Sequence, residues 1–86
     1  MAGKTVIVTD ASSGMGLATA RALAASGARV VLAVRSAGKG KAAAAVIRGI
    51  TEVRELELAS LESVRAFAAG WDGPVDLLIN NAGVAA

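Results

Sequence analysis

The sequence predicts an α/β fold, with a doubly wound parallel sheet of four strands in the order 3-2-1-4 and three helices. The first observation is that strand-like runs and helical segments alternate along the chain. The second is that two of these runs are continuously apolar, which is typical of strands buried on both faces. The third is that the connecting segments are long enough for right-handed crossovers between parallel strands.

The first half of the chain is predicted to hold the two buried strands. They are the runs at residues 5–9 and 29–34, which are rich in β-branched residues and continuously apolar apart from polar residues at their ends. Between them an alanine-rich helix is expected from about residue 13 to 26, with Gly27 as its stop. The small-residue face that brings this helix close to the sheet is expected to carry Ala18, Ala22 and Ala25.

The second half is predicted to hold the edge strand and the fourth strand. Residues 35–41 are expected to form a basic loop that contains glycine, followed by a short helix over 42–48. Charged and apolar residues alternate over 53–58, which predicts a partly covered strand at the sheet edge. Ser60 is expected to cap the third helix, and the fourth strand is placed at 75–80. The apolar face of the third helix is expected to carry Leu61, Val64, Phe67 and Ala68.

The composition excludes several classes of site and partner. The chain has no Cys and no His, so it offers neither thiolate nor imidazole ligands for a metal, and no metal site is expected. A net charge of +2, with one Trp and one Phe, is too weak a basis for nucleic-acid binding. No apolar run reaches the roughly 18 residues of a membrane span. With no long signal-peptide core at the N-terminus, a cytoplasmic protein is expected.

A turn of small residues, 10–16, joins the first strand to the first helix. Glycines here allow the backbone to approach a diphosphate, and the helix N-terminus offers free N–H groups with a partial positive charge. The alternative is a tight turn whose glycines serve packing, since the strict G-x-G-x-x-G pattern is not present. Thr9 and Asn80 are expected at the carboxyl ends of the first and fourth strands, where the chain direction reverses and such sheets bind ligands.

Two motifs lie in register on these elements. Residues 9–16 read Thr-x-Ala-Ser-Ser-Gly-Met-Gly, which resembles the T-G-x-x-x-G-x-G turn of the short-chain dehydrogenase/reductase family, and residues 80–83 match its N-N-A-G motif. The resemblance covers the whole chain, and the segment 35–40 further resembles retinol-dehydrogenase-like members. It implies a Rossmann fold and the transfer of a hydride between NAD(P) and a carbonyl or alcohol.

The resemblance also implies a cofactor site. The residues around the adenosine ribose and the diphosphate would be Ser12, Ser13, Gly14, Met15 and Gly16. Glu57 and Leu58 would border the adenine. The end of the fourth strand would be held, and the cofactor riboses approached, by Asn80, Asn81, Ala82 and Gly83. The alternative for the two asparagines is a turn that satisfies its own backbone.

The chain departs from the family pattern at two positions. Glu57 stands where the family usually has Asp, which keeps the charge and lengthens the side chain by one methylene. Asp10 stands at the first turn glycine and adds a negative charge beside the phosphate site. At about 5 Å and an effective dielectric of about 20, that repulsion is roughly 3 kcal/mol, or about a hundredfold in affinity. Alternatively, the Asp10 carboxylate occupies the anion site at the helix N–H groups.

The end of the second strand predicts the choice of nicotinamide cofactor. In dinucleotide folds an acidic residue about 20 residues past the turn binds the ribose 2′-OH of NAD, whereas Arg favours the 2′-phosphate of NADP. Here the strand ends in Arg35 with no acid nearby, so NADP is predicted over NAD. Lys39 and Lys41 follow near a helix start, where the dipole disfavours cations, and are expected to form a solvated face.

The catalytic Ser, Tyr and Lys of the family follow the N-N-A-G strand. This chain ends three residues after Gly83 and has no Tyr, so no catalytic residue is assigned. Residues 1–86 are therefore expected to be an N-terminal dinucleotide-binding part that is inactive alone. The alternatives are a non-catalytic truncated fragment whose binding is impaired by Asp10, and a nucleotide-binding regulatory module. The fourth strand is expected to be an exposed apolar edge that leads to self-association or a homo-oligomer.

Overall fold

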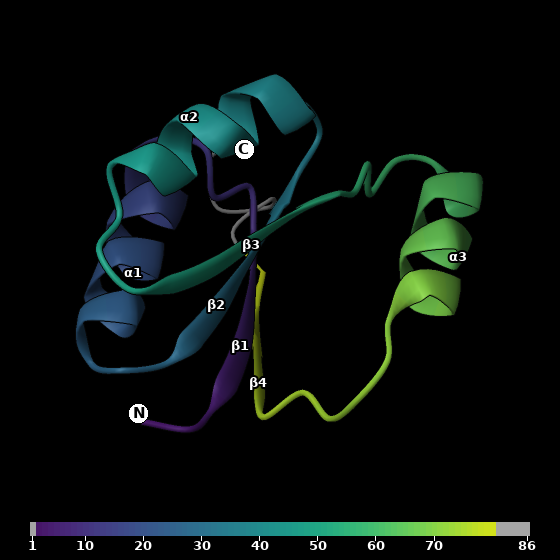
Figure 1. The fold of residues 1–86 in the computed structure, drawn as a ribbon. Coiled ribbons are helices and arrows are strands. Elements are labelled where there is room, and N and C mark those ends of the chain that lie inside the picture. Colours follow the sequence, from purple (N-terminus) through teal and green to yellow (C-terminus); the bar gives the residue numbers. More distant parts are fainter. Residues whose placement is uncertain (1, 81–86) are drawn as a thin grey trace.

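The structure is a computed structural model that describes residues 2–80 (Figure 1). Its elements are β1 (Thr5–Thr9), α1 (Gly14–Ala25), β2 (Arg29–Val34), α2 (Ala37–Ala45), β3 (Ile50–Glu55), α3 (Leu61–Gly70) and β4 (Leu77–Ile79). All neighbouring strands pair in parallel, in the order β3-β2-β1-β4. The predicted doubly wound sheet is therefore confirmed. No helix within residues 2–80 is long and apolar enough to cross a membrane.

The core is built around the two central strands, β1 and β2. Val8 and Leu32 are fully buried on the face that α1 and α2 cover. Ile7 and Val31 are buried on the opposite face, toward α3. Both faces of these strands are covered, which is why their sequences are continuously apolar instead of alternating.

Helix α1 packs on the sheet with a different face from the predicted one. Its buried residues are Gly16, Ala20 and Ala24, and the predicted residues Ala18, Ala22 and Ala25 are all exposed. The rotation follows from the start of the helix, because a Cβ added at Gly16 would lie 2.1 Å from the carbonyl oxygen of Asp10. Gly16 therefore has to face the turn, and the residues four and eight positions later face the sheet with it.

Helix α2 begins earlier than predicted, so the expected loop over 35–41 is wrong. Ser36 caps the helix by accepting a hydrogen bond from the backbone N–H of Lys39 at 3.4 Å. Gly40 is buried, and a Cβ there would lie 2.6 Å from methyl groups of both Val34 and Val53. The glycine allows close packing of the helix on the sheet, and the helix ends at Ala45, before the predicted residue 48.

Strand β3 lies at the sheet edge, as predicted, but it runs over residues 50–55 instead of 53–58. The Glu52 carboxylate, on the α3 face of this strand, forms ion pairs with Arg54 and with Arg29 of β2. The hydrogen bond from Arg54 holds the pKa of Glu52 below its usual range, and Arg29 acts in the same direction. Two of the charged residues of β3, Glu52 and Arg54, are therefore paired with each other.

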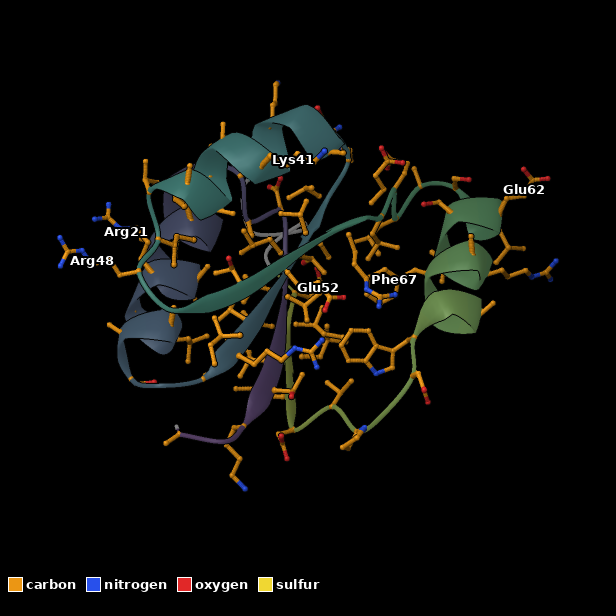
Figure 2. All side chains as sticks on the ribbon, in the orientation of Figure 1. Arg21, Lys41, Arg48, Glu52, Glu62 and Phe67 are labelled. Carbon is orange, nitrogen blue, oxygen red and sulfur yellow. The ribbon has the colours of Figure 1, made fainter. Side chains whose placement is uncertain are left out.

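Helix α3 is attached to the sheet through aromatic residues at its C-terminal end. Phe67 stacks on Trp71 with ring centroids 6.1 Å apart, and the Arg54 guanidinium lies 5.1 Å from the Trp71 ring centroid. Figure 2 shows Phe67 and Glu52 in the space between the sheet and α3, where they line a shallow hollow. The predicted cap is confirmed, since the Ser60 hydroxyl accepts from the Ser63 N–H at 3.2 Å.

The apolar face predicted for α3 is largely exposed. Phe67 is half-buried, whereas the other three members, Leu61, Val64 and Ala68, are exposed. Strand β4 covers only residues 77–79, within the predicted 75–80, and Leu78 is 61% exposed on the α3 face. The sheet is therefore less covered on this face near β4 than on the α1–α2 face.

Candidate functional site

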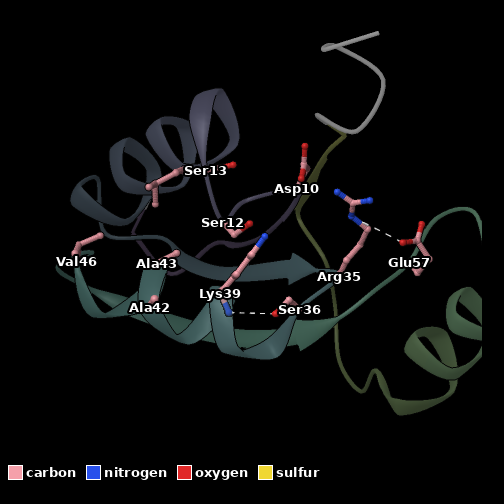
Figure 3. Close-up of a pocket in the computed structure, with 11 residues that line it drawn as sticks. Asp10, Ser12, Ser13, Arg35, Ser36, Lys39, Ala42, Ala43, Val46 and Glu57 are labelled. Carbon is pink, nitrogen blue, oxygen red and sulfur yellow. Dashed lines mark hydrogen bonds and ion pairs between the residues drawn. The ribbon is translucent and has the colours of Figure 1, made fainter.

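A pocket of about 720 Å³ lies beyond the carboxyl ends of β1 and β2, between α1 and α2 (Figure 3). Its polar lining consists of Asp10, Ser12, Ser13, Arg35, Ser36, Lys39 and Glu57. Its apolar lining consists of Leu17, Ala42, Ala43 and Val46. The pocket thus combines a small apolar floor with charged and hydroxyl groups, which is typical of a small-molecule site.

The turn after β1 leaves the N-terminus of α1 open at this pocket. The backbone N–H of Asp10 still donates to the Ala33 carbonyl at 3.0 Å, and Asp10 itself has a φ of 53°. Ser13 precedes the helix in an extended conformation and makes no side-chain cap hydrogen bond. No acidic residue lies in the first turn of α1. Its first N–H groups and the positive end of its dipole are therefore available to an anion.

The N-terminus of α2 lies at the same pocket. Ser36, the N-cap of this helix, and Lys39, in its first turn, both line the pocket, and the first turn also lacks an acidic residue. Arg35 immediately precedes the helix. Two helix N-termini and two cations thus converge on one cavity, an arrangement that suits phosphate groups. Asp10 and Glu57 oppose these charges at the rim.

Arg35 and Glu57 face each other across this rim. Arg35 Nε lies 3.8 Å from Glu57 Oε2, and the Arg35 side chain is 74% exposed (Figure 3). Leu58, predicted beside the adenine together with Glu57, does not line the pocket and is 42% exposed. Of the two residues assigned to the adenine, the structure therefore brings only Glu57 to the pocket.

The other predicted residues divide between the pocket and its surroundings. Ser12 and Ser13 line the pocket; Gly14, Met15 and Gly16 belong to α1 and do not. Met15 is 66% exposed. Asn81, Ala82 and Gly83 lie outside the described residues. The use of all these positions in cofactor binding stays a prediction.

Thr9 and Asn80 meet at the point where the chain direction reverses. The Thr9 hydroxyl lies 3.0 Å from Asn80 Oδ1 and 3.4 Å from the Ile79 carbonyl oxygen, in hydrogen-bond contact with both. The contact joins the carboxyl ends of β1 and β4. The two residues lie together, as expected from the sheet order.

Sequence reasoning missed part of the lining. Lys39 and Lys41 are both exposed, in agreement with the expected solvated face, but Lys39 also lines the pocket, which the sequence did not predict, whereas Lys41 does not. A Ser before an alanine-rich stretch is a helix-start signal, and it would have identified Ser36 as the N-cap and placed Lys39 in the first turn. Within residues 2–80 the Asp10 carboxylate accepts no hydrogen bond from the α1 N-terminus, so it does not occupy that anion site.

Comparisons with known proteins identify relatives along the whole chain. The short chain dehydrogenase family profile matches residues 4–86. Retinol dehydrogenase 12 of Homo sapiens is 47% identical over 95% of this chain, and retinol dehydrogenase 13 of Homo sapiens is 51% identical over 95%. The chain spans only 28% and 27% of the lengths of these two relatives.

Solved structures resemble this chain in fold as well as in sequence. Actinorhodin polyketide ketoreductase with NADPH has a TM-score of 0.85 and 33% identity, over 96% of this chain and 35% of that chain. A metagenomic short-chain oxidoreductase in complex with NADP has a TM-score of 0.82 and 38% identity, over 96% of this chain and 40% of that chain. Both of these relatives were solved with a nicotinamide dinucleotide phosphate.

Proposed function

The chain belongs to the short chain dehydrogenase family, and we propose that residues 1–86 form the NADP-binding part of an oxidoreductase. The observation that carries this proposal is the convergence of two helix N-termini and Arg35 on one pocket at the carboxyl ends of the central strands. When bound, the nicotinamide group would supply hydride transfer to or from a carbonyl or alcohol. The cytoplasmic location predicted from the sequence stays a prediction.

The residues at the pocket fit such a cofactor by their chemistry. The open N–H groups at the start of α1, next to Ser12 and Ser13, would hold the diphosphate. Arg35 would bind the 2′-phosphate through its guanidinium, with Lys39 as a second cation at the same cavity. The lack of a side chain at Gly16 keeps α1 against the turn, so these donors stay at the end of β1.

Arg35→Ala is expected to weaken NADPH binding by about tenfold to a hundredfold, because charged hydrogen bonds contribute about 1.5–3 kcal/mol. NADH lacks the 2′-phosphate, so its affinity should change little. Calorimetric titration of both nucleotides would measure the dissociation constants. Lys41→Ala is the matched control, since it removes a cation of α2 that lies outside the lining. An equal loss for both nucleotides would place Arg35 away from the 2′-phosphate.

One observation favours a second candidate, a Rossmann fragment with impaired cofactor binding. Asp10 lines the pocket with an exposed carboxylate, close to the turn that would hold the diphosphate. The chain also has no Tyr, the residue that the family uses as proton donor. We therefore propose that this chain does not transfer hydride by itself, whichever candidate holds. An assay of NADPH oxidation with purified chain tests this directly.

We also propose that the 86-residue chain associates through the outer edge of β4. On its other side β4 pairs with β1, and none of the described residues pairs with this outer edge. Leu77 and Leu78 are 42% and 61% exposed. Asp76 is the charge nearest this edge, but its carboxylate accepts a hydrogen bond from the Thr5 N–H at 2.7 Å. It is thus turned toward its own sheet and does little to deter pairing.

Sedimentation over a concentration series should show oligomers that Leu78→Lys reduces, because a charged edge disfavours strand pairing. Leu61→Lys is the matched control, since Leu61 is similarly exposed at 63% but lies on α3. Oligomers that survive Leu78→Lys would place the contact elsewhere. A chain that stays monomeric at high concentration would contradict the proposal.

A further inference from the structure

Glu57 lies in the loop between β3 and α3, and both its backbone and its side chain form hydrogen bonds there. Its carboxylate Oε1 accepts from the Ala59 N–H at 3.0 Å. Its own N–H donates to the Ser63 hydroxyl at 2.7 Å, and its carbonyl oxygen accepts from the Ser60 N–H at 3.0 Å. Backbone and side chain are therefore both fixed, and the second carboxylate oxygen, Oε2, is held toward the pocket rim.

Arg35 is the opposite case, a long and largely exposed side chain at the same rim. Such a side chain loses considerable rotamer freedom when it has to adopt one conformation. Its Nε faces Glu57 Oε2 at 3.8 Å (Figure 3). A guanidinium is a planar fork, so an acceptor on the Nε side leaves the two terminal NH₂ groups for another partner. The Glu57 carboxylate thus attracts the Nε side of the Arg35 guanidinium and leaves its terminal NH₂ groups open.

On the basis of the proposed function, we propose that Glu57 is a positioning residue that orients Arg35 for the 2′-phosphate of NADP. Glu57 does not contact the phosphate; it acts through the guanidinium. A carboxylate without this role would have the reverse effect, because its negative charge at the rim would repel the phosphate and favour NAD. The two roles therefore predict effects of opposite sign when the charge of Glu57 is removed.

Glu57→Gln separates these two roles. The glutamine oxygen still accepts from the Ala59 N–H, so the local fold is kept, while the attraction for Arg35 is lost. We expect NADP affinity to fall about two- to fivefold, the range for an exposed ion pair, with NAD affinity unchanged. In an Arg35→Ala background the same substitution should cause no further loss. Glu55→Gln is the matched control, since Glu55 is exposed at the end of β3 and does not line the pocket.

The test is to measure the dissociation constants of NADP and NAD for four proteins, which are the unchanged chain, Glu57→Gln, Arg35→Ala and the double variant. An increase in NADP affinity with Glu57→Gln would overturn the proposal and assign Glu57 the repulsive role. An equal loss for both nucleotides would also overturn it, since that is the result of a structural role or of a contact with the adenine, which both nucleotides carry. Retention of the loss in the Arg35→Ala background would show that Glu57 acts independently of Arg35.

A measurement on the protein without ligand tests the role of Glu57 independently of the proposed function. NMR of the arginine Nε–H groups should show slower exchange with water for Arg35 in the unchanged chain than in Glu57→Gln. If the protein binds neither dinucleotide, the proposed function fails, and this exchange rate still tests whether Glu57 orients Arg35. Equal exchange rates in the two proteins would overturn the positioning role even if NADP binds.

Discussion

Asp10→Gly is expected to strengthen NADP binding by about a hundredfold at low salt, because it removes a repulsion of roughly 3 kcal/mol from the diphosphate. The structure places the Asp10 carboxylate on the lining of the pocket, exposed and without a hydrogen bond to the α1 N-terminus. Its charge is therefore neutralised by no helix N–H group. Glycine also suits the φ of 53° at this position better than a residue with a side chain.

Asp10→Asn separates the charge from the backbone. Asparagine tolerates positive φ about as well as aspartate and keeps the shape of the side chain, but it is neutral. If the charge dominates, both variants should gain affinity in calorimetric titrations, and the gain should shrink as salt screens the exposed carboxylate. A gain with glycine alone would assign the effect to the backbone. Unchanged affinity in both variants would mean that the Asp10 carboxylate lies away from the diphosphate.

The sheet was predictable because its central strands are simple in physical terms. Val6 to Val8 and Val30 to Val34 are buried from both sides, so their apolar runs are continuous and their bounds can be identified from sequence. The strand order followed from the handedness of parallel crossovers and from the charged third strand. The cap at Ser60 was also predictable, because it depends only on a hydrogen bond between residues three positions apart in the sequence.

The helix positions were less predictable because contacts remote in sequence determine them. The sequence predicts a loop at Gly40, and only the nearby methyl groups of Val34 and Val53 show why a glycine belongs inside α2. Periodicity alone placed Leu61 and Val64 on one apolar face of α3, and both are exposed in the structure. Periodicity shows which residues share a face, but it does not show how far that face lies from the sheet.

Several residues of the candidate site were predictable from the sequence, but the ion pair between two of them was not. Ser12, Ser13 and Arg35 were assigned from motif and strand-end position, and they do line one pocket. The contact between Arg35 and Glu57 joins residues 22 positions apart and depends on the loop after β3. No sequence pattern encodes that pairing, because it requires both the register of β3 and the fixed Glu57 carboxylate.

Gly16→Ala is expected to lower the free energy of unfolding by about 2–3 kcal/mol, the effect of overpacking a tight contact. The new Cβ would lie 2.1 Å from the Asp10 carbonyl oxygen and 2.8 Å from its carbonyl carbon, and both atoms are backbone. A neighbouring side chain could adopt another rotamer, but these are backbone atoms. The backbone at Asp10 cannot move without breaking the 3.0 Å hydrogen bond from the Asp10 N–H to the Ala33 carbonyl oxygen. Helix α1 would have to shift, and its N–H groups would leave the pocket, so NADP affinity should fall as well.

The same substitution at Gly38 is the matched control. Gly38 lies in the first turn of α2, and the nearest atom to an added Cβ is the Ser36 hydroxyl oxygen at 3.8 Å. Gly38→Ala should therefore stabilise the protein by up to about 1 kcal/mol through helix propensity. Urea unfolding of both variants measures the difference, and opposite signs are expected. If Gly16→Ala is as stable as the unchanged chain, α1 moves away from Asp10 freely, and NADP affinity then reports whether its N-terminus holds the diphosphate.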